Sequence, residues 1–560
     1  MNHPDTVDPV KTNDSSQGYN QFDLWINTTT GKCFLCRQNM LGAALWVPLT
    51  PPFSVKAFGA YGNGVNDDTK AVQNAITAAC LQALGSGSYP GSVYFPAGVY
   101  LISEQAGTGN KNTQNITFAA QDTTGTFQLN LILLSKTAAP TPRTTPQINY
   151  DHSNTATTAF NIAAGLNMTS AGNIGAQCPD PGPGSTTYQV TFPEIQGAIP
   201  PMTATINTGL TSVSIAILTA GAALATPGNL VGLRIFGDGP RQAPWSGLQP
   251  PANYPPAGSV LVWQGNIDGI MLEIRDAVNP QIENLSVVGA NTSTVPSPGV
   301  FPQIARNGIL FSSTGGAGAN YEVSNCTFTQ FTSQASPQLP NAGVQFGITG
   351  NDFLCAQSCF INSVFANIGV GGNGILLRNN QSVTHRLFGC DFGGLTNAIW
   401  AQAGGNLSVY GSHFGAVGTV LRLGTSLGYP YQGGGPNAST FLLHNIRTES
   451  NASAGPNVTL VDAGYLSGFA SIEINGWDDV KTIATDPTPA IILGQGADVI
   501  LRNSLVQRTA ITSLAMESGS VLSVTATQQG SGYNPAAGVP KLRGDGIMRP
   551  PGSWMPVKEL

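Results

Sequence analysis

The sequence predicts an all-β protein built mainly as a right-handed parallel β-helix, a solenoid of stacked rungs. Glycine accounts for 68 of the 560 residues and charged residues for only 9%, so small and β-branched residues suited to strands and tight turns dominate the chain. Short alternating segments that each end in a turn recur loosely from Gly232 to about Arg508. Such repeats of about 20 to 50 residues are typical of solenoids.

Four segments show the repeat most clearly: NYEVSNCTF from Asn320, THRLFGCDF from Thr384, LSVYGSHF from Leu407 and SIEINGWDD from Ser471. The same alignment places Cys326, Cys359, Cys390 and Ser412 at equivalent positions. We therefore expect an internal ladder of thiols and a hydroxyl, stacked at the strand spacing of about 4.8 Å. Packing is the expected role of this ladder, although the spacing also permits one disulfide.

One clear helix precedes the repeats, within Phe53–Cys80. Asp67 or Asp68 is placed to cap its N-terminus. Apolar residues then recur at helical spacing, at Val72, Ala75, Ile76, Ala79 and Cys80. We expect this amphipathic helix to cover the open end of the solenoid, whose core must be shielded from water.

The helix and the strand after it carry a family resemblance. Together, VKAFGAYGNGVNDDTKAVQNAI and GSVYFPAGVYLIS closely resemble the opening of the pectate-lyase-like superfamily of β-helices, which also includes many phage tailspikes. The resemblance spans Val55 to Ser103. It implies a fold, and it implies assembly into a homotrimer for a tailspike.

A small module lies before this opening. Residues 1–20 are rich in Asn, Asp and Ser and are expected to be disordered, and Phe22–Leu49 has a hairpin signature around a Thr-Thr-Gly turn. FDLWINTTTGK and GAALW resemble modules near the N-termini of phage tail fibres and tailspikes, which implies attachment to a virion. Cys33 and Cys36 form a lone CxxC motif, and no metal is expected there because zinc needs four ligands.

A long segment separates the first rung from the next one, GLRIFGDGP at Gly232. Its runs FQLNLILLS, YQVTF and SVSIAILTA alternate like strands, so we expect an inserted β-rich subdomain. The expected organisation is an attachment module and linker at 1–52, a capping helix and first rung at 53–103, the insertion at 104–231, the β-helix at 232–530 and a tail or cap at 531–560.

Charge and termini restrict the partners. The net charge is −6 and the pI about 5.4, and no Lys/Arg cluster is present, so neither nucleic acid nor an anionic membrane is expected as a partner. The N-terminus lacks the apolar region of a secretion signal, and no apolar run is long enough to span a membrane. A neutral or weakly charged polymer fits better, and the long lateral face of a solenoid suits one. No cofactor is expected.

Outward side chains at one rung position form a column, so groups far apart in the sequence meet across rungs. The position after the ladder carries Thr327, Asp391, His413, Arg447 and Trp477 on successive rungs. We expect His413 to tune or relay a proton, Arg447 to bind an acidic sugar or developing charge, and Trp477 to stack on a sugar face.

Carboxylates follow two positions further along. The alignment places Glu449 and Asp479 on adjacent rungs about 5 Å apart, and Asp391 two rungs from Glu449, about 10 Å away. Retaining glycosidases hold their carboxyl groups about 5 Å apart and inverting ones about 6.5 to 9.5 Å, so both geometries stay open. We expect Asp391, Glu449 and Asp479 to be catalytic, one of them protonated near neutral pH, with Asp478 in the substrate-binding set. The alternative is an ordinary solvated face.

A second outward patch is carried by Glu322 and Arg386, four residues before the ladder position. We expect a structural ion pair with bridging water. The motifs of pectin-hydrolysing relatives do not identify a catalytic site in this sequence. Only Asp478-Asp479 resembles one of them, and the repeat region contains no Arg-x-Lys. No catalytic residue is therefore carried over by motif.

The leading hypothesis is a phage tailspike located in the virion tail. It would bind other tail proteins through its N-terminus and recognise a bacterial capsule or lipopolysaccharide, which it would also cleave as a hydrolase rather than a lyase. The alternatives are a non-catalytic receptor-binding or structural tail protein, and a bacterial pectinase-like hydrolase or lyase.

Overall fold

The computed structural model divides the chain into two compact units, residues 1–53 and 54–560. The structure describes residues 2–7, 9–27, 33–49, 52–85, 91–108, 112–133, 141–167, 176, 178, 180–192, 202–220, 230–239, 258–265, 269–289, 304–313, 318–331, 341–347, 355–366, 372–378, 384–402, 405–424, 439–450, 457–465, 470–480, 486, 488–492, 497–506, 521–525, 528–529, 547–549 and 555–556. Strand β5 (Phe53–Ser54) lies at the boundary between the units.

The N-terminal unit is a four-stranded sheet in the order β1-β2-β3-β4. Its elements are β1 (Asn2–Asp5), the 3-10 turn η1 (Ser15–Gln17), β2 (Leu24–Asn27), β3 (Cys33–Gln38) and β4 (Leu45–Leu49). The expected hairpin is present, but the expected disorder of residues 1–20 is wrong. The indole of Trp25 donates to the carbonyl of Val7 and that of Trp46 to the carbonyl of Asn13. Two buried tryptophans thus hold this polar segment in place. The composition of residues 1–20 alone gives no indication of these contacts.

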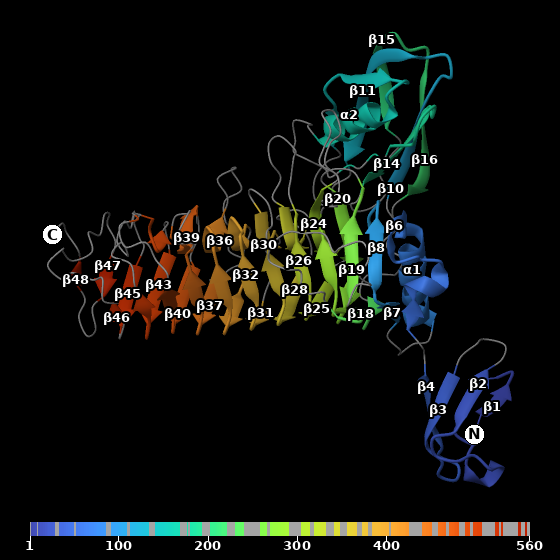
Figure 1. Cartoon of the computed structure of the whole chain (residues 1–560), viewed down its shortest axis with the longest axis horizontal. Coiled ribbons are helices and arrows are strands. Elements are labelled where there is room, and N and C mark those ends of the chain that lie inside the picture. Colours follow the sequence, from blue (N-terminus) through green and yellow to red (C-terminus); the bar gives the residue numbers. More distant parts are fainter. Residues whose placement is uncertain are drawn as a thin grey trace. The chain divides into compact units, whose positions relative to one another are not determined.

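The second unit contains a right-handed parallel β-helix whose rungs form three sheets (Figure 1). Sheet 1 contains β7 (Ser92–Phe95), β17 (Leu230–Val231), β18 (Arg234–Gly237), β21 (Ala277–Val278), β22 (Gln281–Glu283), β25 (Gly318–Ser324), β28 (Cys355–Ile361), β31 (His385–Phe388), β34 (Leu407–Tyr410), β37 (Ser439–His444), β40 (Ala470–Asn475), β43 (Ala497–Arg502), β45 (Val521–Thr525), β47 (Ile547–Arg549) and β48 (Met555–Pro556). Sheet 2 contains β6 (Asn63–Asp67), β8 (Gly98–Ile102), β19 (Ser259–Trp263), β23 (Ser286–Val288), β26 (Thr327–Thr329), β29 (Val364–Ala366), β32 (Asp391–Gly393), β35 (His413–Gly415), β38 (Arg447–Glu449), β41 (Asp478–Val480), β44 (Leu505–Val506) and β46 (Gln528–Gln529). Sheet 3 contains β9 (Ala106–Gly107), β20 (Gly269–Arg275), β24 (Ala305–Ser312), β27 (Asn341–Phe346), β30 (Gly372–Leu377), β33 (Asn397–Ala401), β36 (Thr419–Gly424), β39 (Thr459–Tyr465) and β42 (Ile491–Ile492).

The helix α1 (Thr69–Gly85) follows η2 (Val55–Phe58) and begins where the two aspartates predict. An oxygen of Asp67 accepts from the N–H of Thr69 at 3.0 Å, and the Asp68 carboxylate accepts from the N–H groups of Tyr61 and Gly62. The predicted apolar face is fully buried: Val72, Ala75, Ile76, Ala79 and Cys80. Because α1 packs against β7 and β9, it covers the first rung.

Residues between the first and second rungs form a β-rich insertion with its own core. Its elements are β10 (Asn112–Phe118), β11 (Thr124–Leu133), β12 (Thr141–Thr144), β13 (Ile148–Asp151), α2 (Thr155–Asn167), β14 (Thr187–Phe192), β15 (Thr203–Thr208) and β16 (Val213–Ala220). The helix α2 was not expected. Within the described residues, neither helix is long and apolar enough to cross a membrane.

Sheets 1 and 2 are joined by a two-residue corner that repeats on successive rungs. Its first residue has a positive φ and is Asn or Gly, the residue types that adopt this conformation most readily: Asn284, Asn325, Asn362, Gly389, Gly411, Asn445, Gly476 and Asn503. Its second residue is buried: Leu285, Cys326, Ser363, Cys390, Ser412, Ile446, Trp477 and Ser504. Serines at this position also bind the backbone, since the Ser412 hydroxyl accepts from the N–H of Cys390 at 3.2 Å.

This corner is the internal ladder, with one correction to its membership. The expectation that Cys359 belongs to it is wrong, because Cys359 pairs with Glu322 and Arg386 in sheet 1. The ladder position on that rung is occupied by Ser363. Aligning cysteine with cysteine displaced that rung, whereas the left-handed Asn or Gly marks the true register. The seven cysteines whose side chains the structure describes are free: Cys36, Cys80, Cys178, Cys326, Cys355, Cys359 and Cys390.

Behind sheet 2, phenylalanines stack along the inside of the β-helix. Phe328, Phe365, Phe392 and Phe414 follow one another with ring centroids 5.0, 4.9 and 5.0 Å apart. Each is fully buried. The stack fills the interior at one position of each rung, so the outward neighbours on the same strands are held at defined heights along the axis.

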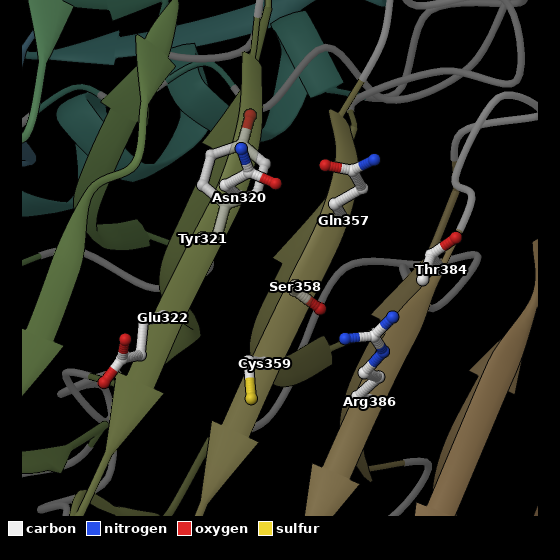
Figure 2. Close-up of a pocket in the computed structure, with 8 residues that line it drawn as sticks. All are labelled: Asn320, Tyr321, Glu322, Gln357, Ser358, Cys359, Thr384 and Arg386. Atoms are coloured by element: carbon white, nitrogen blue, oxygen red, sulfur yellow. The ribbon is translucent and has the colours of Figure 1, made fainter.

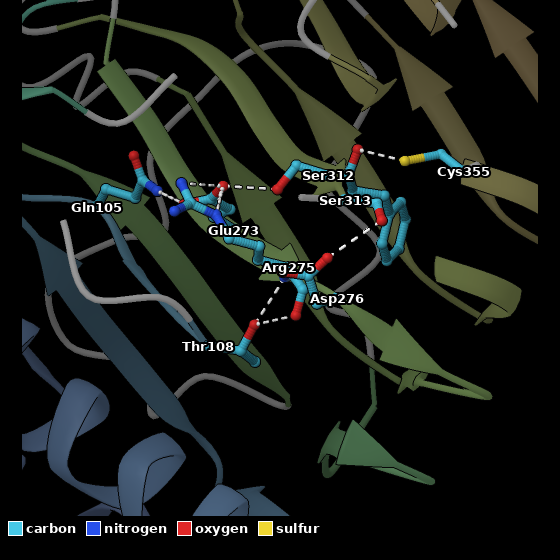
Figure 3. Close-up of polar contacts among 9 residues, drawn as sticks. Gln105, Thr108, Glu273, Arg275, Asp276, Ser312, Ser313 and Cys355 are labelled. Carbon is cyan, nitrogen blue, oxygen red and sulfur yellow. Dashed lines mark hydrogen bonds and ion pairs between the residues drawn. The ribbon is translucent and has the colours of Figure 1, made fainter. Parts of the chain in front are cut away.

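A buried polar network joins the first rungs (Figure 3). The guanidinium of Arg275 donates to one carboxylate oxygen of Glu273, with N–O distances of 2.8 and 2.7 Å. The Glu273 carboxylate also accepts from Gln105 and from the Ser312 hydroxyl, and the Thr108 hydroxyl bonds the backbone of Arg275. Charges buried in this way are tolerated only when fully paired, so the network ties together residues from three successive rungs.

The phenylalanine stack leads to a stability prediction. Phe365→Ala removes a buried ring between two others and should lower the free energy of unfolding by about 3 to 5 kcal/mol. Phe388→Ala is the control, because that ring is 39% exposed on the outer face and should cost about 1 kcal/mol or less. Chemical denaturation of both variants measures the difference, and equal losses would contradict the interior stack.

A second prediction concerns His385, which is 1% exposed inside sheet 1 with Nδ1 2.6 Å from the Ser358 hydroxyl. Burial lowers the pKa of His385 from its ordinary value of 6.5 to about 3. The unfolded chain therefore binds this proton more readily, so the contribution to stability is full above pH 6.5 and is lost as the pH falls towards 3. We expect about 2 kcal/mol of acid destabilisation from this group between about pH 7 and pH 5.

The matched variant is His385→Leu, because Leu407 occupies the paired position on the next rung. The measurement is the free energy of unfolding at both pH values. The loss on acidification should be about 2 kcal/mol smaller in the variant than in the original chain. An unchanged pH dependence would show that the imidazole is not held neutral.

Candidate functional site

A column of charged side chains lies on the outer face of sheet 2. The first residues of β32, β35, β38 and β41 are paired in order, so that Asp391 meets His413, His413 meets Arg447, and Arg447 meets Asp478. The same sheet begins with Ser, Thr and Val at this position, on β23, β26 and β29. We call Asp391, His413, Arg447, Asp478 and Glu449, which lies two residues beyond Arg447, the charged column.

His413 links two carboxylates of the column. Its Nδ1 lies 2.9 Å from Oδ1 of Asp391, and its Nε2 lies 3.5 Å from Oε2 of Glu449. The side chains of Asp391, His413 and Glu449 are 30%, 37% and 23% exposed, so all three are partly desolvated yet open to solvent. Gly415 leaves room for the ring, because a Cβ there would lie 3.1 Å from Cε1 of His413.

The arrangement suits proton transfer. Asp391 orients the imidazole through Nδ1, while Nε2 faces the second carboxylate, so a proton taken up at one end of the ring is matched by one released at the other. Asp391 and Glu449 lie two rungs apart, about 10 Å along the axis. The exposed guanidinium of Arg447 lies on the same strand as Glu449 and provides a positive charge for an acidic group or a developing oxyanion.

Two residues of the expected site lie inside the β-helix. Asp479 is fully buried and accepts from the Thr448 hydroxyl at 3.0 Å. Trp477 is 1% exposed and its indole donates to the same hydroxyl at 2.8 Å. The expected roles of Asp479 as a catalytic carboxylate and Trp477 as a sugar platform are therefore wrong.

A one-residue shift explains this correction. Aligning the repeats with one another places Gly476 at the ladder position. Gly476 has a φ of 76°, however, and is the first residue of the corner, so the ladder position is occupied by Trp477. Glu449 consequently pairs with Val480 and Thr448 with Asp479. Because strand side chains alternate between faces, a slip of one residue exchanges inward and outward positions. Asp478, rather than Asp479, faces outward.

A second outward row on the same rungs was not foreseen. In sheet 3, Trp400 pairs with Arg422 and Arg422 with Asp462. The guanidinium carbon of Arg422 lies 4.7 Å from the centroid of the Trp400 ring, and Nε of Arg422 is 4.0 Å from Oδ2 of Asp462. These three residues come from separate repeats without a shared motif, so only the register of the rungs brings them together. Within the described residues, no group of three or more His, Cys, Asp or Glu side chains is placed to hold a metal ion.

Comparison with known proteins bears on the fold. Residues 52–131 match the family model described as rhamnogalacturonase A/epimerase, pectate lyase-like. This match includes α1 and the strands of the first rung, and it confirms the resemblance expected from Val55 to Ser103.

Two curated relatives match a stretch of 51 residues, 9% of this chain, at 53% identity. They are the plasmin and fibronectin-binding protein A of Streptococcus pneumoniae, where the match covers 6% of the protein, and the mannuronan C5-epimerase AlgE1 of Azotobacter vinelandii, where it covers 3%. The match thus spans only a small part of either relative.

Among solved structures, ORF18 of Geobacillus virus E2 aligns with 96% of this chain and 72% of its own, at 10% identity and a TM-score of 0.34. The catalytic unit of a GH87 α-1,3-glucanase from Streptomyces thermodiastaticus aligns with 88% of this chain and 68% of its own, at 12% identity and a TM-score of 0.39.

The corrected register leads to a direct test with neighbouring residues. Asp479→Asn alters a buried carboxylate that accepts a hydrogen bond, and it should lower the free energy of unfolding by about 1 to 3 kcal/mol. Asp478→Asn makes the same chemical change one residue away on the outer face and should alter stability by no more than about 0.5 kcal/mol. Thermal or chemical denaturation of both proteins measures this. The opposite ranking would restore the expected outward position of Asp479.

Proposed function

Starting from a parallel β-helix of the pectate-lyase-like superfamily, we propose that this chain is a phage tail protein of the tailspike type that binds a bacterial surface polysaccharide and hydrolyses it. The charged column carries this proposal. In a chain with only 9% charged residues, a carboxylate, an imidazole, a guanidinium and two further carboxylates converge on one outer face. Their clustering favours a site over a solvated surface.

Hydrolysis of a glycosidic bond needs one carboxyl group to protonate the leaving oxygen and another to activate water. We assign Glu449 as the acid and Asp391 as the base. The two carboxyl groups lie on either side of the His413 ring, at 2.9 and 3.5 Å from its nitrogens. A separation that holds an imidazole supports inversion of configuration, for which carboxyl groups lie about 6.5 to 9.5 Å apart, rather than retention at about 5 Å.

His413 completes this assignment as a relay. After an inverting turnover the base holds a proton and the acid has lost one. Asp391 then gives its proton to Nδ1 of His413 while Nε2 passes one to Glu449. Both carboxyl groups are thereby reset, and the imidazole keeps its charge but changes from the Nε2–H to the Nδ1–H tautomer, which proton exchange with solvent at this partly exposed ring reverses before the next turnover. The contacts of 2.9 and 3.5 Å on the two ring nitrogens support this path. Arg447 and Asp478 flank the pair as substrate-binding residues.

The remaining parts of the proposal concern assembly. The likeness of FDLWINTTTGK and GAALW to tail-fibre modules supports attachment of the N-terminal unit to other tail proteins, and hence a location in the virion tail. We propose a homotrimer, in which neighbouring chains would cover outer faces of a solenoid that has few charges to keep it soluble.

The experiment follows the products of purified protein with a panel of bacterial capsular polysaccharides and lipopolysaccharides. New reducing ends without unsaturated uronates are expected, because a hydrolase makes the first and only a lyase makes both. Glu449→Gln should slow release at least about 100-fold, the lower end of what general acid catalysis contributes, while leaving the melting temperature unchanged.

Glu473→Gln is the matched control, because Glu473 is an outward glutamate on β40 of sheet 1 and should retain full activity. Undiminished cleavage by Glu449→Gln would overturn the assigned site. Binding of polysaccharide without any cleavage by the original chain would replace the hydrolase with a non-catalytic receptor-binding protein.

A further inference from the structure

A hollow of about 330 Å³ lies on the outer face of sheet 1, over β25, β28 and β31 (Figure 2). Its floor follows three paired residues, Glu322, Cys359 and Arg386. Its volume is at the lower end of the roughly 300 to 1,000 Å³ typical of ligand pockets. A hollow of this size suits a single small unit rather than a long segment of polymer.

The two charges in the hollow lie apart from each other. Glu322 and Arg386 each pair with Cys359 rather than with one another, so the expected ion pair through a bridging water stays a prediction. They lie two rungs apart, about 10 Å along the axis, and the small side chain of Cys359 occupies the rung between them. Both charges nevertheless act on the thiol: its pKa is raised by burial and further by Glu322, and lowered by Arg386.

The rim of the hollow shows backbone strain at polar residues. Asn320, Gln357 and Thr384 have φ values of 58°, 62° and 61° on three successive rungs, a conformation that glycine adopts without penalty. It is particularly unfavourable for Thr384, whose side chain is β-branched. Asn320 adopts this conformation readily, as the corner asparagines do, but Gln357 and Thr384 are kept at positions where glycine would be less strained, and such strain is commonly associated with functional sites.

We propose that this hollow is a second, non-catalytic binding site for one sugar unit of the polysaccharide. The Glu322 carboxylate would accept hydrogen bonds from sugar hydroxyls, and the Arg386 guanidinium would donate to a ring oxygen, a hydroxyl or an anionic substituent at the other end. The amides of Asn320 and Gln357 supply both donors and acceptors along the rim. An acceptor at one end and a donor at the other also orient the bound unit along the axis.

The position of the hollow relates it to the charged column. Arg386 on β31 and Asp391 on β32 belong to the same rung, on either side of the corner at Gly389. The hollow extends from this rung towards β25 on sheet 1 and the charged column towards β41 on sheet 2, so a glycan bound at both would follow the axis and cross the corner at this rung. The inference therefore rests on the proposed function and adds a site that holds the polymer away from the reacting bond.

The first test measures binding of purified capsular polysaccharides, each in native and carboxyl-reduced form. Arg386→Gln should weaken binding of a recognised polymer about tenfold and leave the rate of cleavage at saturating polymer unchanged. Arg502→Gln is the control, because Arg502 is also an exposed sheet 1 arginine but lies on β43 beside Glu473, and it should bind normally. If carboxyl reduction weakens binding by the original chain but does not further weaken binding by Arg386→Gln, Arg386 binds an anionic substituent; if reduction weakens both proteins equally or has no effect, Arg386 binds a neutral oxygen. In every case Arg386→Gln must weaken binding of the native polymer.

The second test uses Cys359 as a reporter. Among the seven cysteines whose side chains the structure describes, it is the one that is not buried. Alkylation by iodoacetamide at mildly alkaline pH, followed by peptide mass mapping, should be slowed at least fivefold by a saturating recognised polymer. If the polymer binds, but Arg386→Gln binds equally well and Cys359 is not protected, the second site is overturned while the proposed function stands. If none of the polysaccharides binds, both the second site and the proposed function are overturned.

Discussion

The corner between sheets 1 and 2 is the constraint on which the rest of the β-helix depends. Each corner bends the chain from sheet 1 into sheet 2 within two residues, which requires one residue in the left-handed region and one buried residue behind it. Asn and Gly satisfy the first requirement at low cost. Hydroxyls such as Ser363, Ser412 and Ser504 satisfy the second and also bind backbone groups at the corner. Since strands alternate, this corner determines which side chains of sheet 2 point inwards on each rung.

The inward and outward positions of sheet 2 change character at different rungs. Phenylalanines fill the interior from β26 to β35, and the interior then becomes polar at Thr448 and Asp479. The outer face becomes charged earlier, at Asp391 and His413, which lie on the same strands as the buried Phe392 and Phe414. The Thr448 hydroxyl and the Asp479 carboxylate, held by the Trp477 indole, support the strands that carry Arg447, Glu449 and Asp478, so a polar interior lies beneath that half of the proposed site.

The buried charges inside the first rungs have a structural role, unlike the outward charges of the proposed site. Glu273 and Arg275 are 1% and 2% exposed and fully engaged with hydroxyl and amide groups from neighbouring rungs. A well-packed apolar replacement of such a pair is often as stable, so the network is better understood as matching particular side chains across particular rungs. Where the chain enters the β-helix and is interrupted by the insertion, this matching favours one pairing of rungs over shifted ones.

The sequence by itself determined the fold class, the capping helix at Asp67 to Cys80 and the principal strands of the insertion, because each depends on local periodicity and capping chemistry. It also placed Asp391, His413 and Arg447 in one column and Glu449 two positions further along, since their repeats are similar enough to align. Only the tertiary structure decided which positions Trp477, Asp479 and Cys359 occupy in their rungs. Their positions depend on a register set by backbone conformation at Gly476 and Asn362, and a shift of one residue exchanges the inside of a strand for its outside.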